Sequence, residues 1–277
     1  MAKGHAVRAT GGAAVKLAKI DPATNGGLDK EQGEAALAPL AAEIGELQEL
    51  LFAAREQSVL VVLQGVDASG KDGTVRAVLR DVNPAGSRVV SFKAPTPHEL
   101  AHDFLWRIHQ QAPEFGYLVV FNRSHYEDVL VPRVRGSIDE AVWRERYEAI
   151  NAFERLLARN GTLLLKAYLH ISEEEQEERL RAREADVTKA WKLKAGDWLD
   201  RRSWQAFRAA YDDALTATAT AEAPWHVVPA DRKWFRNLAV AEALVDLLRP
   251  HKDRWLETLR RRGEAELIEI QKLRGGA

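Results

Sequence analysis

The apolar residues of the chain fall into short continuous runs and into longer stretches with helical spacing. Most of the short runs lack the polar–apolar alternation of a strand with one wet face, so we expect them to be strands buried on both faces of a sheet. Buried strands of this kind are typical of parallel sheets covered by helices. The predicted strands are 59–63, 88–92, 117–121, 162–169 and 225–228.

Helical patterns separate these strands. Before the first strand, leucine and isoleucine residues recur at spacings of three and four and predict a helix over 34–56. Further helices are expected over 73–82, 98–111 and 138–159 and from 172 onward. Strand alternating with helix predicts an α/β fold, with a parallel five-stranded sheet, right-handed crossovers and helices on both faces.

The two ends of the chain differ from this central region. Residues 1–32 are rich in Gly, Ala and Lys and contain turn signals, so they predict an N-terminal arm that packs on the body or on a partner chain. Residues 33–250 predict one domain, and 251–277 predict a C-terminal helix. The helices over 34–56 and from 251 are candidate oligomer contacts.

Composition excludes several classes of protein. The chain has no cysteine, which removes disulfides, thiolate metal sites and thiol nucleophiles. Its net charge of −1 argues against a general nucleic-acid coat. No run of about 18 apolar residues and no secretory h-region occur, so a cytoplasmic protein without a membrane partner is expected.

Four loops are expected to share the rim where the carboxyl ends of the strands meet, because ligands of parallel α/β sheets bind there. The first contains the sequence GVDASGKDGT, in which Gly65, Gly70 and Lys71 have the spacing of a phosphate-binding loop. In such loops backbone N–H groups surround phosphate oxygens, and the lysine reaches the transferred group. The alternative is a tight turn whose glycines only relieve backbone strain. The candidate phosphate and nucleotide contacts at this rim are Gly65, Ala68, Ser69, Gly70, Asp72, Gly73, Thr74, Lys93 and Asn122.

The loop departs from the usual pattern because Asp72 stands where a Ser or Thr hydroxyl normally binds Mg²⁺. Carboxylate oxygens suit a hard cation that bridges phosphates, so Asp67 is the natural replacement as metal ligand. Asp72 has a second interpretation, as an acid that favours the first turn of a helix.

The loop after the third strand has the sequence FNRSHYEDVLVPRV. Arg123 and Arg133 are suited to bidentate phosphate contact. Glu127 has two interpretations, as a metal or substrate ligand or as the partner of Ser124 in a capping box. A histidine in a first helical turn is more often a packing or surface residue than a general base, so we assign no chemistry to His125.

A basic segment follows the fourth strand and predicts a mobile lid over about 179–200, which closes on the phosphates and excludes water. Its candidate phosphate-neutralising cations are Arg179, Arg183, Lys189 and Lys192. The alternative is a solvated helix in which the preceding glutamates pair with the arginines at helical spacing.

With these residues placed, the sequence resembles the polyphosphate kinase 2 family. The matching stretches are GVDASGKDGT, VNPAGSRVVSFKAPT, HDFLWR, FNRSHYEDVLVPRV, KAWKL and APWHVVPADRKWFRN. The resemblance implies a phosphate-loop kinase that transfers phosphoryl groups reversibly between inorganic polyphosphate and nucleotides with Mg²⁺. It further implies catalytic roles for Asp67, Lys71, Arg123 and Arg183, and metal binding by Asp67 and Glu127.

The stretch FNRS followed by tyrosine and two acids resembles class III of that family, which converts both AMP and ADP toward ATP. The nucleotides expected are adenine nucleotides, with guanine left open, and relatives imply a homodimer or homotetramer. The alternatives are an ADP-only or AMP-only enzyme, a nucleoside monophosphate kinase that uses ATP, and a binding module without turnover.

Overall fold

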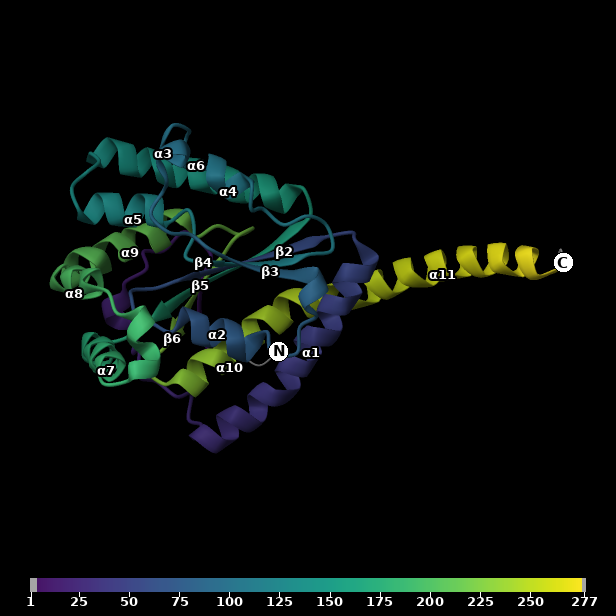
Figure 1. Ribbon diagram of the computed structural model, residues 1–277, viewed down its shortest axis with the longest axis horizontal. Coiled ribbons are helices and arrows are strands. Elements are labelled where there is room, and N and C mark those ends of the chain that lie inside the picture. The colour runs from purple at the N-terminus through teal and green to yellow at the C-terminus, as the bar shows by residue number, and fades with distance from the viewer. Residues whose placement is uncertain (1–3, 276–277) are drawn as a thin grey trace.

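A six-stranded sheet forms the centre of the structure, a computed structural model that describes residues 4–275 (Figure 1). The strand order is β1-β6-β5-β2-β4-β3, and β2 to β6 run parallel. All five predicted strands are confirmed, with each end within one residue of the expected position. The strands are β1 (Val7–Ala9), β2 (Ser58–Gln64), β3 (Ser87–Ser91), β4 (Leu118–Asn122), β5 (Thr162–His170) and β6 (Trp225–Pro229).

The sixth strand, β1, comes from the N-terminal arm and was not predicted. It pairs antiparallel with β6, with Val7 opposite Val227. Farther along the arm, the side chains of Val15 and Leu17 are buried against the body. The arm therefore packs on its own domain. Residues 1–3 of the predicted arm and 276–277 of the predicted C-terminal helix lie outside the described residues.

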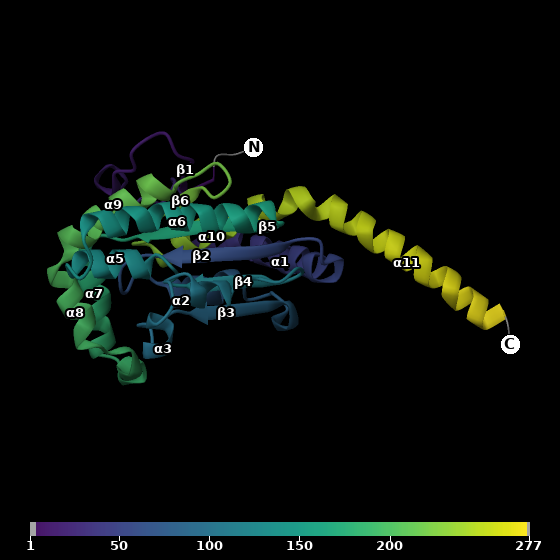
Figure 2. The same ribbon diagram turned by 90° about the horizontal axis from the view of Figure 1, so that it is seen from above.

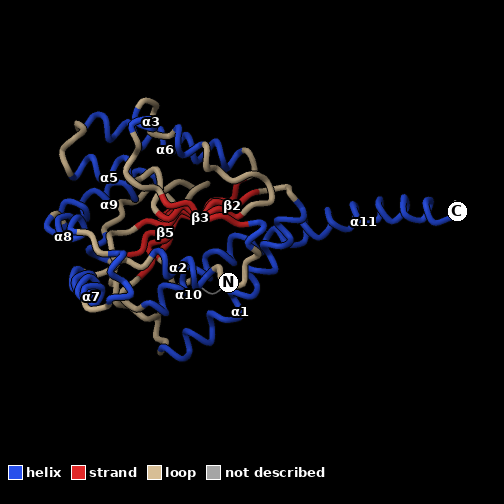
Figure 3. Tube along the Cα trace, in the orientation of Figure 1, coloured by secondary structure: helices blue, strands red, loops and turns tan. Residues whose placement is uncertain are grey.

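Helices cover both faces of the sheet, as expected for strands without alternation. In β2, Val59, Val61 and Leu63 belong to one core cluster, while Leu60 and Val62 belong to the other. Figure 3 shows the strands at the centre with helices around them. The first cluster lies under α1 (Lys30–Ala54), α2 (Lys71–Val78) and α10 (Lys233–Leu248), and the second under α5 (Glu127–Val134), α6 (Glu140–Arg159) and α9 (Trp204–Thr218).

The prediction of a single helix over 98–111 is wrong. The structure has two short helices there, α3 (Pro97–Leu100) and α4 (Trp106–His109). Between them the Asp103 side chain accepts a hydrogen bond from the Leu105 N–H (2.9 Å). Aspartate can bond its neighbouring backbone in this way, which competes with continuous helix. The helix expected from His125 also differs, because α5 begins at Glu127.

The predicted lid consists of two helices and a helical turn beyond the carboxyl ends of the strands, at the end of the body opposite α11 (Figure 2). These are α7 (Glu173–Glu184), η3 (Val187–Lys192) and α8 (Ala195–Arg202). Ser172 caps α7 by accepting from the Glu175 N–H (3.1 Å). The remaining short turns are η1 (Leu17–Lys19), η2 (Pro84–Gly86) and η4 (Arg249–His251).

The last helix, α11 (Lys252–Gly275), leaves the body and projects from it (Figure 1). Its first turns are anchored, since Trp255 is fully buried and donates to Gln57 Oε1 (3.1 Å). Beyond Arg262 every described side chain of the helix is exposed. Among the described residues, no helix combines the length and the apolar composition that a membrane span requires.

Candidate active site

The loop between β2 and α2 has the backbone geometry that its glycines predict. Gly65 and Gly70 have positive φ values of 150° and 102°. A side chain at Gly65 would also place its Cβ 2.8 Å from the Leu169 carbonyl oxygen, closer than real Cβ atoms approach. The loop ends at the N-terminus of α2, where backbone N–H groups and the helix dipole favour an anion.

Lys71 is held tightly beneath this loop. Its ammonium group donates to the carbonyl oxygens of Gly65 (2.6 Å) and Val66 (3.2 Å), and the side chain is only 8% exposed. Burial, with a further contribution from the charge of Arg123, lowers the pKa of Lys71 to about 8. The lysine therefore lies against the loop with an ammonium proton that is more easily lost than in water.

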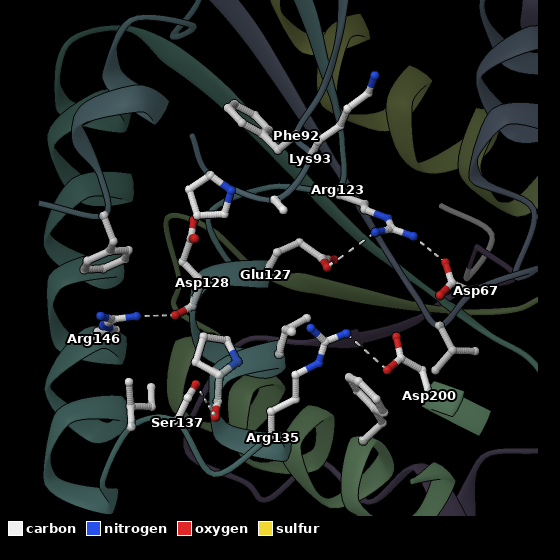
Figure 4. Close-up of a pocket in the computed structure, with 18 of the residues that line it drawn as sticks. Asp67, Phe92, Lys93, Arg123, Glu127, Asp128, Arg135, Ser137, Arg146 and Asp200 are labelled. Atoms are coloured by element: carbon white, nitrogen blue, oxygen red, sulfur yellow. Dashed lines mark hydrogen bonds and ion pairs between the residues drawn. The ribbon is translucent and has the colours of Figure 1, made fainter. Parts of the chain in front are cut away.

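Asp67, Arg123 and Glu127 form a charged cluster beside the loop (Figure 4). One guanidinium nitrogen of Arg123 is paired with Asp67 Oδ1, and the other lies 4.0 Å from Glu127 Oε2. Burial raises the pKa of Glu127, although the charges of Arg123 and Lys71 oppose that shift. Three side chains predicted from two separate stretches of sequence thus lie at one rim.

The capping-box interpretation of Glu127 is wrong. Helix α5 has no side-chain cap, and its N-cap residue is Tyr126. Ser124 Oγ instead accepts from the Tyr126 N–H (3.3 Å) and lies 3.0 Å from the Gln64 amide group, which also reaches Glu127 Oε1 (3.1 Å). Glu127 is consequently available for the site.

The two carboxylates fit a hard divalent cation. Asp67 and Glu127 converge on the same guanidinium from different elements. No group of three or more His, Cys, Asp or Glu side chains that could hold a metal occurs in residues 4–275. Mg²⁺ commonly binds through one or two carboxylates, with water and substrate phosphates as its other ligands. The donor set matches that preference.

Asp72 lies in the first turn of α2, as its second interpretation expected, and it also links the loop to the lid. Its carboxylate accepts from Asn122 Nδ2 (2.8 Å) on β4 and from Lys192 Nζ (2.7 Å) on η3. The hydrogen bond from Lys192 is the main cause of the lowered pKa of Asp72. Asn122 and Lys192 were expected to contact phosphate or nucleotide. In this structure both side chains contact Asp72.

The other lid cations take different places. Arg179 is 9% exposed and donates to the carbonyls of Ala68 and Ser69 (both 3.0 Å). The expectation that Arg179 contacts phosphate is corrected, because its guanidinium binds these carbonyls and supports the loop from behind. Arg183 pairs with Asp197 (3.2 Å) on α8, and burial raises the pKa of that aspartate.

The solvated-helix interpretation of the lid is correct in part. Glu175 pairs with Arg179 (2.6 Å) at helical spacing. Outside the helix, Lys189 pairs with Asp186 (2.6 Å) and is half exposed.

Arg133 does not line the site, which corrects its predicted role. It pairs with Asp213 (2.6 Å) on α9, donates to the Tyr147 hydroxyl (3.2 Å) and stacks over the Trp143 ring (4.0 Å). Arg135, two residues further on, lines the cavity instead.

His125 is a packing residue, fully buried beside Glu154 (3.2 Å). Glu154 in turn pairs with the fully buried Lys166 (2.6 Å). This network lies inside the core, so it anchors the segment that carries Arg123 and Glu127.

A cavity of about 510 Å³ opens beside the charged cluster (Figure 4). It extends from the phosphate loop to α9, and apolar, cationic and acidic side chains line it. Lys93 lies at this cavity as expected. Arg107 also lines the cavity and pairs with Asp128 (2.8 Å). It had no predicted role, although it belongs to the stretch HDFLWR. Further lining residues without a predicted role are Arg135, Arg146, Asp200, Trp204, Phe207 and Tyr211.

Comparisons with known proteins give a consistent result. The family model described as Polyphosphate kinase 2 matches residues 27–254. The AMP/ADP-polyphosphate phosphotransferase of Meiothermus ruber is 50% identical over 237 residues, which are 84% of this chain and 88% of that protein. The ADP-polyphosphate phosphotransferase of Rhodopseudomonas palustris is 38% identical over 265 residues, covering 91% and 90%. The crystal structure of polyphosphate kinase 2 from Arthrobacter aurescens superposes with a TM-score of 0.83 at 44% identity, covering 86% of each chain.

Proposed function

The chain belongs to the polyphosphate kinase 2 family, and from that premise we propose that it transfers phosphoryl groups reversibly between inorganic polyphosphate and adenine nucleotides, with both AMP and ADP as acceptors. The observation that carries the proposal is the charged cluster of Asp67, Arg123 and Glu127, which lines a cavity large enough for a nucleotide beside the phosphate loop that holds Lys71. The named activity of the Meiothermus ruber relative supports the choice of both acceptors.

The mechanism rests on charge neutralisation. Donor and acceptor are both polyanions, and the accepting phosphate oxygen is already ionised, so positioning and electrostatic stabilisation supply most of the catalysis. Lys71 and the loop N–H groups hold the donor phosphates, and Arg123 lies where the donor and acceptor phosphates meet. Asp67 and Glu127 would hold Mg²⁺, which would add to the neutralisation of phosphate charge. Lys192 joins the lid to the loop through Asp72, and Arg183 joins α7 to α8 within the lid.

The nucleotide occupies the cavity. Its apolar wall includes Phe92, Phe104 and Phe207, which suit a base. Arg107 lies over the Phe92 ring (5.5 Å) and Arg146 over the Phe104 ring (5.0 Å). The adenine preference is part of the proposal, and guanine stays open. The sequence expectation of a cytoplasmic enzyme also stays a prediction.

Acceptor use is tested by incubating the protein with long-chain polyphosphate, Mg²⁺ and either AMP or ADP. From AMP we expect ADP to form first and ATP later, and from ADP we expect ATP without a lag. An adenylate kinase inhibitor in parallel samples controls for disproportionation of ADP. Product from ADP alone would contradict the AMP part of the proposal, and no product from either nucleotide would contradict the function.

For the oligomeric state we propose self-association through α11, with a second copy as the partner. Three consecutive arginines, 260–262, precede a segment with three glutamates, so antiparallel pairing of two copies sets opposite charges against each other. The exposed apolar residues of this helix are Leu256, Leu267, Ile268, Ile270 and Leu273.

Sedimentation velocity tests this interface. The double variant Leu267→Glu, Ile270→Glu is expected to convert a wild-type dimer or tetramer into a smaller species. Leu156→Glu, which changes an exposed leucine on α6, is the matched control and should leave the assembly intact. A monomeric wild type at micromolar concentration would contradict the proposal.

A further inference from the structure

Arg236 lies directly behind the phosphate loop, although nothing in the proposed mechanism uses it. It stands on the first turn of α10, within the stretch APWHVVPADRKWFRN, and its side chain is 3% exposed. A Cβ built on Gly70 would lie 1.8 Å from Arg236 Nη1, and one on Gly73 would lie 3.2 Å from Nη2. The guanidinium therefore occupies space that the glycines of the loop leave open.

The charge of Arg236 has no acidic partner among the described residues. Its Nε and Nη2 donate to Asn237 Oδ1 (3.1 and 2.8 Å), and Nη1 donates to the Ser69 carbonyl (3.3 Å). The neighbouring Arg179 donates to the same carbonyl and pairs with Glu175. Of these two neighbouring guanidiniums, only that of Arg179 therefore has a carboxylate partner. Burial and the charge of Arg179 lower the pKa of Arg236 to about 9.

The shared carbonyl connects this charge to the anion-binding side of the loop. The described chain contains no cis peptide, so the N–H of Gly70 points opposite to the Ser69 carbonyl. Donors on that carbonyl polarise the peptide group and strengthen its N–H as a donor. An uncompensated charge behind the loop also attracts an anion in front of it.

We propose that Arg236 is a positioning residue for phosphate, placing behind the loop a buried positive charge whose counter-ion is the polyphosphate bound in front of it. The inference deepens the proposed function, on which it rests for the identity of the anion. It also gives a reason for glycine at position 73, which the phosphate-loop spacing of Gly65, Gly70 and Lys71 does not require.

The test compares the wild type with Arg236→Met, which keeps the length of the side chain and removes its charge. Tripolyphosphate is titrated without nucleotide by calorimetry, and thermal unfolding is followed with and without it. We expect Arg236→Met to weaken tripolyphosphate binding on the order of tenfold. Its unfolding midpoint without ligand should be no lower than that of the wild type, because an unpaired buried charge is removed. Arg236→Lys, which restores the charge, should recover part of the affinity.

Arg249→Met is the control for net charge. Arg249 pairs with Glu43 on the surface, roughly 20 Å along α10 from Arg236 at 1.5 Å per residue, and its loss should leave binding unchanged. Unchanged binding in Arg236→Met would overturn the proposal. So would weaker binding that accompanies a lower midpoint, because the loop would then need Arg236 for its shape. The titration needs no turnover, so it stays decisive even if the wild type makes no ATP.

Discussion

Replacing Lys71 with methionine is expected to lower kcat by about 10²–10³-fold, the effect of losing one preorganised donor to transition-state charge. Methionine fills a similar volume, and the carbonyls that Lys71 contacts belong to a loop with other donors from Arg179. The unfolding midpoint should therefore change little. Steady-state kinetics of ATP formation and thermal unfolding check the two expectations together.

The same lysine predicts an alkaline limit to activity. Because burial lowers the pKa of Lys71 to about 8 in the free protein, its positive charge is lost as the pH rises through that value. The profile of kcat/KM reports groups of the free enzyme, so it should fall above about pH 8. Bound phosphate favours the charged lysine, so kcat should fall only at higher pH. Activity of Lys71→Met within twofold of the wild type would contradict the assigned role.

Asp67→Asn is expected to lower activity by about 10²-fold and to raise the Mg²⁺ concentration needed for half-maximal rate, because the proposed cation loses a charged ligand. Glu127→Gln should act in the same direction. Rates measured across a Mg²⁺ titration test the kinetics, and Mn²⁺ binding followed by electron paramagnetic resonance tests the ligand role directly.

Asp213→Asn provides the matched control for the metal assignment. It makes the same chemical change in an ion pair with Arg133, whose guanidinium lies outside the cavity lining, and it should leave the Mg²⁺ dependence unchanged. An unaltered Mg²⁺ requirement in Asp67→Asn would contradict metal binding by that residue. Loss of activity without weaker Mn²⁺ binding would assign Asp67 to the orientation of Arg123 instead.

Much of the fold could be predicted because its signals are local. Strands β2, β4 and β5 are continuous apolar runs, and burial on both faces of the sheet removes such runs from water. Strand β1 could not be predicted, since three residues of the arm become a strand only through the free edge of β6. The break between α3 and α4 was missed because the Asp103 side chain outweighs the surrounding helical pattern.

The site likewise has features that follow from local sequence and features that depend on tertiary contacts. The spacing of Gly65, Gly70 and Lys71 sets a backbone shape that any phosphate loop needs, so the sequence by itself determined the loop and its lysine. Residue type showed that Arg133 and Arg179 could bind phosphate, but not which other groups would reach them first. Only the tertiary structure decided which acceptors bind each guanidinium, because these are the nearest acceptors in space. For Arg133 the acceptor is on α9, and for Arg179 the acceptors are carbonyls at the back of the loop. The position of Arg236 depends on the packing of α10 against α2. This packing brings its charge to the loop from a segment more than 160 residues away in the sequence.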